Sequence, residues 1–128
     1  MIARNNIFNI RAGGNWLGRT GSKRGFVEFE TRAHAIRAWL VLMRTYRQKH
    51  RCRTIRKIVT RFAPPGENDT EQYIRHCVRH VTKDANATLV NALDYARLGV
   101  AMAQMETGTT LNTEDIFDVM QKYQIQIL

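Results

Sequence analysis

The stretch from Leu89 to Met105 is apolar on nearly every side when it is projected as a helix. Its apolar members are Leu89, Val90, Leu93, Ala96, Leu98, Val100, Ala101, Met102, Ala103 and Met105. A helix that is apolar all round is buried, whereas a surface helix keeps one polar side. The stretch is too short to cross a bilayer, and Asn91, Asp94 and Arg97 interrupt it. We therefore predict that it is the central helix of a small globular core.

A single carboxylate, Glu106, follows this stretch and precedes Thr107 and Gly108. Gly108 suits the left-handed residue that commonly ends a helix. Burial and the negative C-terminal end of the helix would both raise the pKa of Glu106, which would make it a general acid. The alternative is that Glu106 points into solvent at a frayed helix end.

The length of 128 residues predicts one domain, residues 1–128, that can bury a core without disulfides. A hydrophobic fraction of 44% is that of a folded chain. We expect Cys52 and Cys77 to be free thiols, because no secretory signal precedes them. Residues 1–11 lack the apolar run of a signal peptide. We therefore expect the protein to be cytoplasmic on synthesis, with a later association with a virion or cell envelope left open.

Positive charge is concentrated in the first half of the chain. Residues 1–63 hold fifteen Lys and Arg against two acids, a net charge of +13. Residues 64–128 hold five against nine, a net charge of −4, which together give the overall +9. Such a basic half indicates a polyanionic partner, namely nucleic acid, a membrane surface or the anionic bacterial wall. The alternative is a solvated basic face that only aids solubility.

The spacing of apolar residues and capping residues predicts the remaining elements. Phe26–Glu30 alternates apolar and acidic residues, which predicts a strand, and Trp16–Arg19 is its expected partner across a loop at 20–25. Three further helices are expected, one capped by Thr31, one over 54–62 and one capped by Asp69. A last helix is expected from near Thr113. The predicted fold class is mainly α (α+β), with about five helices around one buried helix and a small N-terminal hairpin.

Few other side chains carry a recognisable motif. His76 and His80 share one helix face, but zinc needs at least one more ligand and Cys77 points elsewhere. The sequence contains no Gly-rich phosphate loop and no nucleophile elbow. We therefore predict neither a metal site nor a cofactor. The candidate carboxylates are Glu106, Glu28, Glu30 and Glu67.

Four runs form a series along the chain: Asn5–Arg11, Trp16–Gly18, Phe26–Phe29 and Phe62–Ile74. They resemble a group of phage and prophage proteins described as virion structural proteins. That group has an opening similar to NNPGNIR, a Trp, a Phe-x-x-Phe strand and a WAPPxENxTxxYI stretch. The resemblance spans roughly residues 4–108, and this chain departs from it at Phe62, where the group has Trp, and at residues 7–8, where the group has Pro-Gly.

The group is in turn similar to the lysozyme-like superfamily of peptidoglycan hydrolases. Met102–Gly108 resembles the Glu-Ser-Gly helix end of lytic transglycosylases. In wall hydrolases the catalytic Glu lies upstream of the Asn-rich segment, whereas only four residues precede Asn5 here. The resemblance therefore implies a lysozyme-like domain in permuted order, with the Glu-bearing helix last.

The resemblance implies cleavage of the peptidoglycan glycan strand by a muramidase or lytic transglycosylase, with Glu106 as the single general acid. A hydrolase also needs a second carboxylate, and Glu28 or Glu30 are the candidates in the basic half. If neither reaches the cleft, a transglycosylase with a single Glu is the better interpretation. The expected contacts to the acetamido sugar are Asn6, Asn9 and Tyr73. Turn-capping is the alternative role of the two asparagines.

Two other functions remain open. One is a non-catalytic virion structural or wall-binding protein that keeps the fold without the chemistry. The other is a basic nucleic-acid-binding module, although the spacing of Trp39 and Tyr46 is that of a core stripe. The expected partners are peptidoglycan glycan strands or another polyanion, and other virion proteins in the non-catalytic case.

Overall fold

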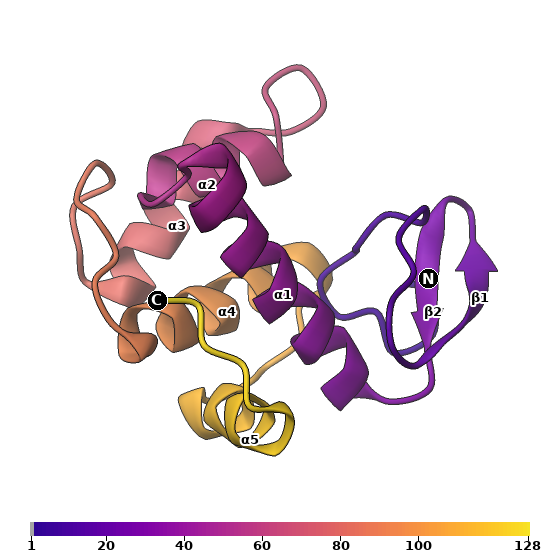
Figure 1. The fold of residues 1–128 in the computed structure, drawn as a ribbon. Coiled ribbons are helices and arrows are strands. Elements are labelled where there is room, and N and C mark those ends of the chain that lie inside the picture. Colours follow the sequence, from indigo (N-terminus) through magenta and orange to yellow (C-terminus); the bar gives the residue numbers. More distant parts are fainter. Residues whose placement is uncertain (1) are drawn as a thin grey trace.

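The computed structural model describes residues 2–128, within which five helices accompany one two-stranded antiparallel hairpin (Figure 1). The elements are β1 (Arg19–Lys23), β2 (Phe26–Phe29), α1 (Arg32–His50), α2 (Ile55–Phe62), α3 (Thr70–Val81), α4 (Ala92–Thr107) and α5 (Thr113–Tyr123). The predicted class, mainly helical with a small N-terminal hairpin, is confirmed. Among the described residues, no helix is both long enough and apolar enough to cross a membrane.

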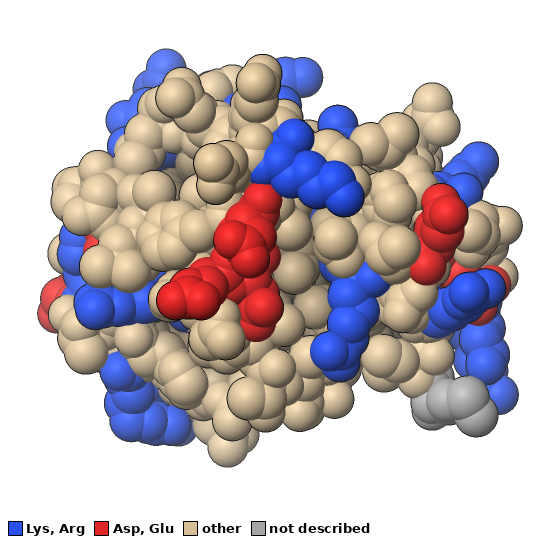
Figure 2. Space-filling model, turned by 90° about the horizontal axis from the view of Figure 1, so that it is seen from below, with Lys and Arg blue, Asp and Glu red and all other residues tan. Residues whose placement is uncertain are grey.

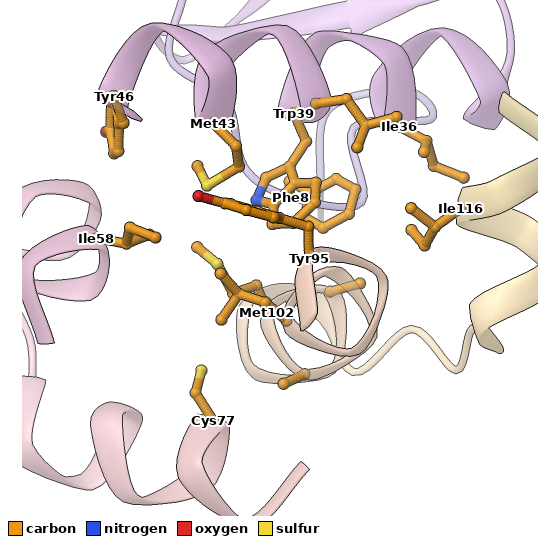
Figure 3. Close-up of a cluster of buried hydrophobic side chains, with 14 of the residues drawn as sticks. Phe8, Ile36, Trp39, Met43, Tyr46, Ile58, Cys77, Tyr95, Met102 and Ile116 are labelled. Carbon is orange, nitrogen blue, oxygen red and sulfur yellow. The ribbon is translucent and has the colours of Figure 1, made fainter. Parts of the chain in front are cut away.

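Helix α4 forms the centre of the core. Half of its residues are buried, a larger share than in any other helix, and it packs against α3 and α5. Figure 3 shows Trp39 and Met43 of α1 pointing toward Tyr95 and Met102 of α4, while Ile116 of α5 closes one side. The prediction of one central buried helix follows from the apolar residues on all its sides and is confirmed.

The predicted start of this helix was wrong by three residues. Helix α4 begins at Ala92, because the side chain of Asn91 accepts a hydrogen bond from the backbone N–H of Asp94 at 2.8 Å. Leu89 is buried before the helix, whereas Val90 is 60% exposed. An N-cap residue takes a non-helical backbone conformation, so the chain turns at Asn91 although its apolar neighbours continue the pattern.

The predicted pairing of the hairpin was also displaced. Strand β1 occupies most of the expected loop at 20–25, and its last residue, Lys23, pairs with Phe26. The turn consists of Arg24 and Gly25 alone, with φ angles of 52° and 85°. Two consecutive residues with positive φ give a turn whose twist matches that of the strands, so a two-residue turn replaces the longer loop. An irregularity in the register lies between Arg19 and Gly21.

The N-terminal segment before β1 is irregular but well anchored. The buried Asn6 amide donates to the carbonyls of Ile10 at 2.9 Å and Val27 at 2.8 Å, and its oxygen accepts from the Ile10 N–H. Phe8 stacks on Trp39 of α1 with ring centroids 5.2 Å apart. Asn9 adopts a left-handed backbone conformation with φ of 52°, which Asn tolerates better than most residues. These contacts fix the segment against the hairpin and α1.

The first residues of the other helices agree closely with those predicted from the sequence. Thr31 and Asp69 are the N-caps of α1 and α3, as predicted, and Thr54 caps α2 rather than forming its first residue. The N-cap of α5 is Asn112, which forms a reciprocal capping box with Asp115. Both cysteines are free, as expected, and both are buried.

Candidate functional site

An open cavity of about 590 Å³ lies where the N-terminal segment and hairpin meet α1, α2 and the end of α4. Its lining residues are Asn9, Ile10, Arg11, Gly14, Trp16, Phe26, Leu42, Tyr46, Arg61, Phe62, Ala63, Pro64, Glu67, Asn68 and Glu106. In Figure 1 these segments are the hairpin region on the right, the middle of the molecule and the loop at the top. The walls thus combine aromatic and apolar side chains with six polar or charged ones, so the cavity offers both apolar faces and hydrogen-bonding groups.

Glu106 lines this cavity from the last turn of α4. The Asn9 side-chain amide donates to its carboxylate Oε1 at 3.2 Å and to its backbone carbonyl at 3.1 Å. Burial raises the pKa of Glu106, and the nearby Tyr73 hydroxyl, the hydrogen bond from Asn9 and the charge of Arg11 offset only part of that rise. Glu106 therefore faces the N-terminal segment and favours the protonated form more than an exposed glutamate does.

The end of α4 is held in place by the residues that follow Glu106. Gly108 takes the left-handed conformation, with φ of 69°, and its N–H donates to the Gln104 carbonyl at 2.9 Å. The Thr107 hydroxyl donates to the Ile7 carbonyl at 2.9 Å. The predicted glycine cap is confirmed, and Thr107 ties the helix end to the N-terminal segment.

Tyr73 lies beside Glu106, and its side chain is buried. Burial first, and the Glu106 charge second, raise the pKa of Tyr73 well above its usual value, so its hydroxyl keeps its proton. This hydroxyl makes no hydrogen bond of ordinary geometry within residues 2–128, yet it is close enough to lower the pKa of Glu106. Tyr73 lies close to Glu106 but outside the cavity lining, so its proposed contact to a sugar stays a prediction.

The remaining predicted site residues separate into two groups. Asn9 lines the cavity, but Asn6 is fully buried and uses its amide within the N-terminal segment, so the turn-capping alternative applies to Asn6. Glu28 lies outside the lining and accepts a long hydrogen bond from the Arg4 N–H at 3.5 Å. Glu30 is exposed and also lies outside the lining. The structure thus brings Glu106, Asn9 and Tyr73 together and leaves Asn6 and Glu28 apart from them.

Sequence reasoning missed the charged side chains at the cavity rim. Arg11 and Glu67 form an ion pair at 3.4 Å, and the Arg11 guanidinium lies 5.7 Å from the centre of the Phe26 ring. The Arg61 guanidinium lies 5.4 Å from the centre of the Tyr46 ring. Their partners come from distant parts of the chain, so no spacing in the sequence indicates these contacts. Of these rim residues, only Glu67 was among the candidate carboxylates named from the sequence.

Charge is distributed unevenly over the surface. Of the fifteen cationic side chains in residues 1–63, only Arg11 and Arg56 form an ion pair with an acid in the described chain. Figure 2 shows acidic groups gathered over α5, with Lys and Arg around them. Helix α5 carries three acids in its sequence, Glu114, Asp115 and Asp118. Most of the basic charge of the first half is therefore not neutralised by an ion pair within the described residues.

Residues 2–128 contain no group of three or more His, Cys, Asp or Glu side chains that would hold a metal ion. The rings of His76 and His80 lie 4.5 Å apart. One ring nitrogen of His76 is 3.0 Å from the Ala101 carbonyl, so this side chain bridges α3 and α4.

Comparison with known proteins gives one informative relative. No family model matches the chain. Protein P5 of Pseudoalteromonas phage PM2 is 35% identical to it over 120 residues. The aligned region covers 89% of this chain and 74% of the phage protein.

Proposed function

The chain belongs to the family of protein P5 of Pseudoalteromonas phage PM2, and we propose that it cleaves the glycan strands of peptidoglycan with Glu106 as the general acid. The observation that carries the proposal is the position of Glu106. It is the half-buried carboxyl of the cavity, at a helix end that faces an Asn-bearing segment.

The environment of Glu106 suits proton donation to a glycosidic oxygen. A general acid has to hold its proton until the bond between the sugar carbon and that oxygen breaks, and burial favours the protonated carboxyl. The Asn9 amide occupies Oε1, which leaves the other carboxyl oxygen to carry the proton. The Asn9 amide therefore orients the acid, and the Tyr73 hydroxyl lies close to it.

The cavity also suits a polymer of sugars. It is open rather than enclosed, so a strand can pass through it without threading its end. Trp16, Phe26 and Tyr46 give flat apolar faces that match those of sugar rings. Arg11 and Arg61 supply positive charge at the same walls, and the basic first half attracts an anionic wall polymer.

A non-catalytic virion structural protein is the second candidate function. Membership of a phage protein family favours it without any chemistry at Glu106. In that case, Tyr73 and Asn9 would serve only to pack the end of α4 against the N-terminal segment.

The test measures the release of soluble fragments from purified, dye-labelled peptidoglycan. Glu106→Gln keeps the size of the side chain and removes the acidic proton, so we expect release to fall by about 10²- to 10⁴-fold. The matched control is Glu114→Gln, on the exposed side of α5, which should release fragments at the wild-type rate. Circular dichroism of each variant checks that it is folded.

Two results would overturn the proposal. Wild-type release by Glu106→Gln would remove Glu106 from the reaction. A folded wild-type protein that releases nothing from any wall preparation would leave the non-catalytic function in its place.

A further inference from the structure

We infer that Glu67 is the second carboxylate of the proposed reaction and acts as the general base that activates water. The inference rests on the proposed function. Within the described chain, Glu67 and Glu106 are the two acidic residues that line the cavity. Glu106 comes from the end of α4, and Glu67 comes from the loop between α2 and α3, which projects at the top of Figure 1. Two carboxylates from separate segments thus face one open space.

Arg11 connects the two carboxylates. Its guanidinium lies 3.4 Å from the Glu67 carboxylate, and its positive charge also lowers the pKa of Glu106. Arg11 therefore lines the cavity together with both acids and pairs directly with one of them. Since Arg11 follows Asn9 by two residues, the segment that orients Glu106 also holds Glu67.

The two carboxylates have opposite surroundings. Glu106 is half-buried, and burial favours its protonated form. The side chain of Glu67 is 63% exposed and lies 3.4 Å from the Arg11 guanidinium, which leaves room for water at its oxygens. A pair of titratable groups in such different environments is the usual arrangement of an acid and a base in one site.

The loop that carries Glu67 is held at its base and within its turn. The Thr70 hydroxyl donates to the Ala63 carbonyl at 2.7 Å, and both residues are buried. The Asn68 side-chain amide donates to the Pro64 carbonyl at 3.2 Å, and Pro65 restricts the backbone between them. The loop therefore presents Glu67 in a defined place although the side chain is exposed.

The step balances with water as the only co-reactant. Glu106 gives its proton to the glycosidic oxygen as the bond from that oxygen to the anomeric carbon breaks. The oxygen of a water molecule forms the new bond to the anomeric carbon, and the proton that this water loses goes to Glu67. The products are an alcohol and a sugar with a free reducing end. Direct attack by water inverts the configuration at the anomeric carbon.

This inference separates hydrolysis from the transglycosylase reaction. A transglycosylase with a single Glu leaves an anhydro-sugar end, because a hydroxyl of the same sugar takes the place of water. Sequence reasoning favoured that outcome if neither Glu28 nor Glu30 reached the cleft, and both lie outside the cavity lining. Glu67 supplies the missing carboxylate, so we expect free reducing ends.

The experiment follows fragment release and end groups on purified peptidoglycan, with and without sodium azide. Glu67→Gln and Glu67→Ala should release fragments about a hundredfold more slowly than wild type, because no base deprotonates the water. Azide needs no deprotonation, so it should restore strand cleavage in Glu67→Ala and leave a glycosyl azide that mass spectrometry detects. Azide should not restore cleavage in Glu106→Gln.

The control Glu71→Gln changes an exposed acid on α3 that pairs with Arg56 outside the cavity, and it should retain wild-type release.

The outcomes distinguish this inference from the proposed function. Anhydro-sugar ends from the wild type, or full activity in both Glu67 variants, would overturn the role of Glu67 while the dependence on Glu106 still stands. No release by the wild type would overturn the proposed function, and the role of Glu67 with it. Azide rescue of Glu67→Ala, with reducing ends from the wild type, would support both.

Discussion

At the scale of single residues, Glu106 links folding stability to pH. Burial raises the pKa of Glu106 in the folded protein above its value in the unfolded chain. The folded state therefore binds more protons than the unfolded state in the pH range between the two pKa values. The free energy of unfolding should fall as pH rises through that range, because the folded state then has to hold a partly buried charge.

Glu106→Gln removes this titration and keeps an acceptor for the Asn9 amide. We expect the variant to be more thermostable than wild type at about pH 8 and to lose this advantage below about pH 4, where the wild-type carboxyl is protonated in both states. Thermal unfolding curves over this pH range provide the measurement. Glu114→Gln, which is exposed, should show no such gain. A Glu106→Gln variant that is no more stable than wild type at any pH would contradict the burial of this group.

The position of Glu106 at the end of the central helix could be predicted from sequence, because local rules determine it. It directly follows a buried apolar helix and precedes a glycine cap. Local rules do not predict which of the nearby asparagines reaches the cavity. Asn6 is fully buried, whereas Asn9 lines the cavity. Nothing in an Asn-rich stretch says which amide turns inward. Glu67 is similar, because its place depends on how the loop between α2 and α3 meets Arg11, which is 56 residues away.

At the scale of elements, Gly99 determines how closely α1 approaches α4. A Cβ at this position would lie 3.0 Å from the Trp39 ring and 3.0 Å from Ile116 Cδ1. The Ile116 methyl can shift, but the Trp39 ring is fully buried and stacked on Phe8. The same stack holds the N-terminal segment on α1.

We expect Gly99→Ala to lower the free energy of unfolding. Alanine favours the helix by about 1 kcal/mol over glycine, but overpacking a filled core costs roughly 1–3 kcal/mol. Since the crowded neighbour is a rigid ring, the net loss should be about 1 kcal/mol. Urea denaturation measures it. A variant that is more stable than wild type would show that Trp39 can move away from α4.

The pattern of apolar residues predicted the existence and burial of α4 correctly, but it did not predict where the helix begins. Apolar residues on all sides identify a central helix, because only burial accounts for them. Val90 has the same apolar character but is exposed, and Asn91 ends the preceding loop by capping the helix. The hairpin was likewise predicted correctly as an element but with the wrong strand end. The positive φ angles of Arg24 and Gly25, rather than the alternation of Phe26–Glu30, determine where β1 ends.

At the scale of the whole molecule, the uneven charge should govern association with a polymer. The net charge of +9 comes from the first half of the chain, and most of its cations have no acidic partner within residues 2–128. Binding to a polyanion releases counterions, so its affinity depends steeply on salt.

We expect inactive Glu106→Gln to sediment with purified peptidoglycan at about 50 mM salt and to dissociate as salt rises to about 300 mM. Duplex DNA of several sequences serves as the competitor. Sequence-dependent binding to DNA that survives high salt would favour a nucleic-acid-binding module instead. Failure to bind any polyanion would show that the basic half is only a solvated face of the protein.

The most direct test of the role of Glu106 combines a ¹³C NMR titration of its carboxyl with the pH profile of kcat/KM on soluble glycan strands. A general acid works only while it holds its proton, so activity should fall as pH rises through the pKa of Glu106. We predict that this carboxyl titrates above the ordinary glutamate value of about 4.3, and that the alkaline limb of kcat/KM has its midpoint at the same pH. An ordinary pKa for Glu106, with strand cleavage that continues unchanged above it, would contradict its role as the acid.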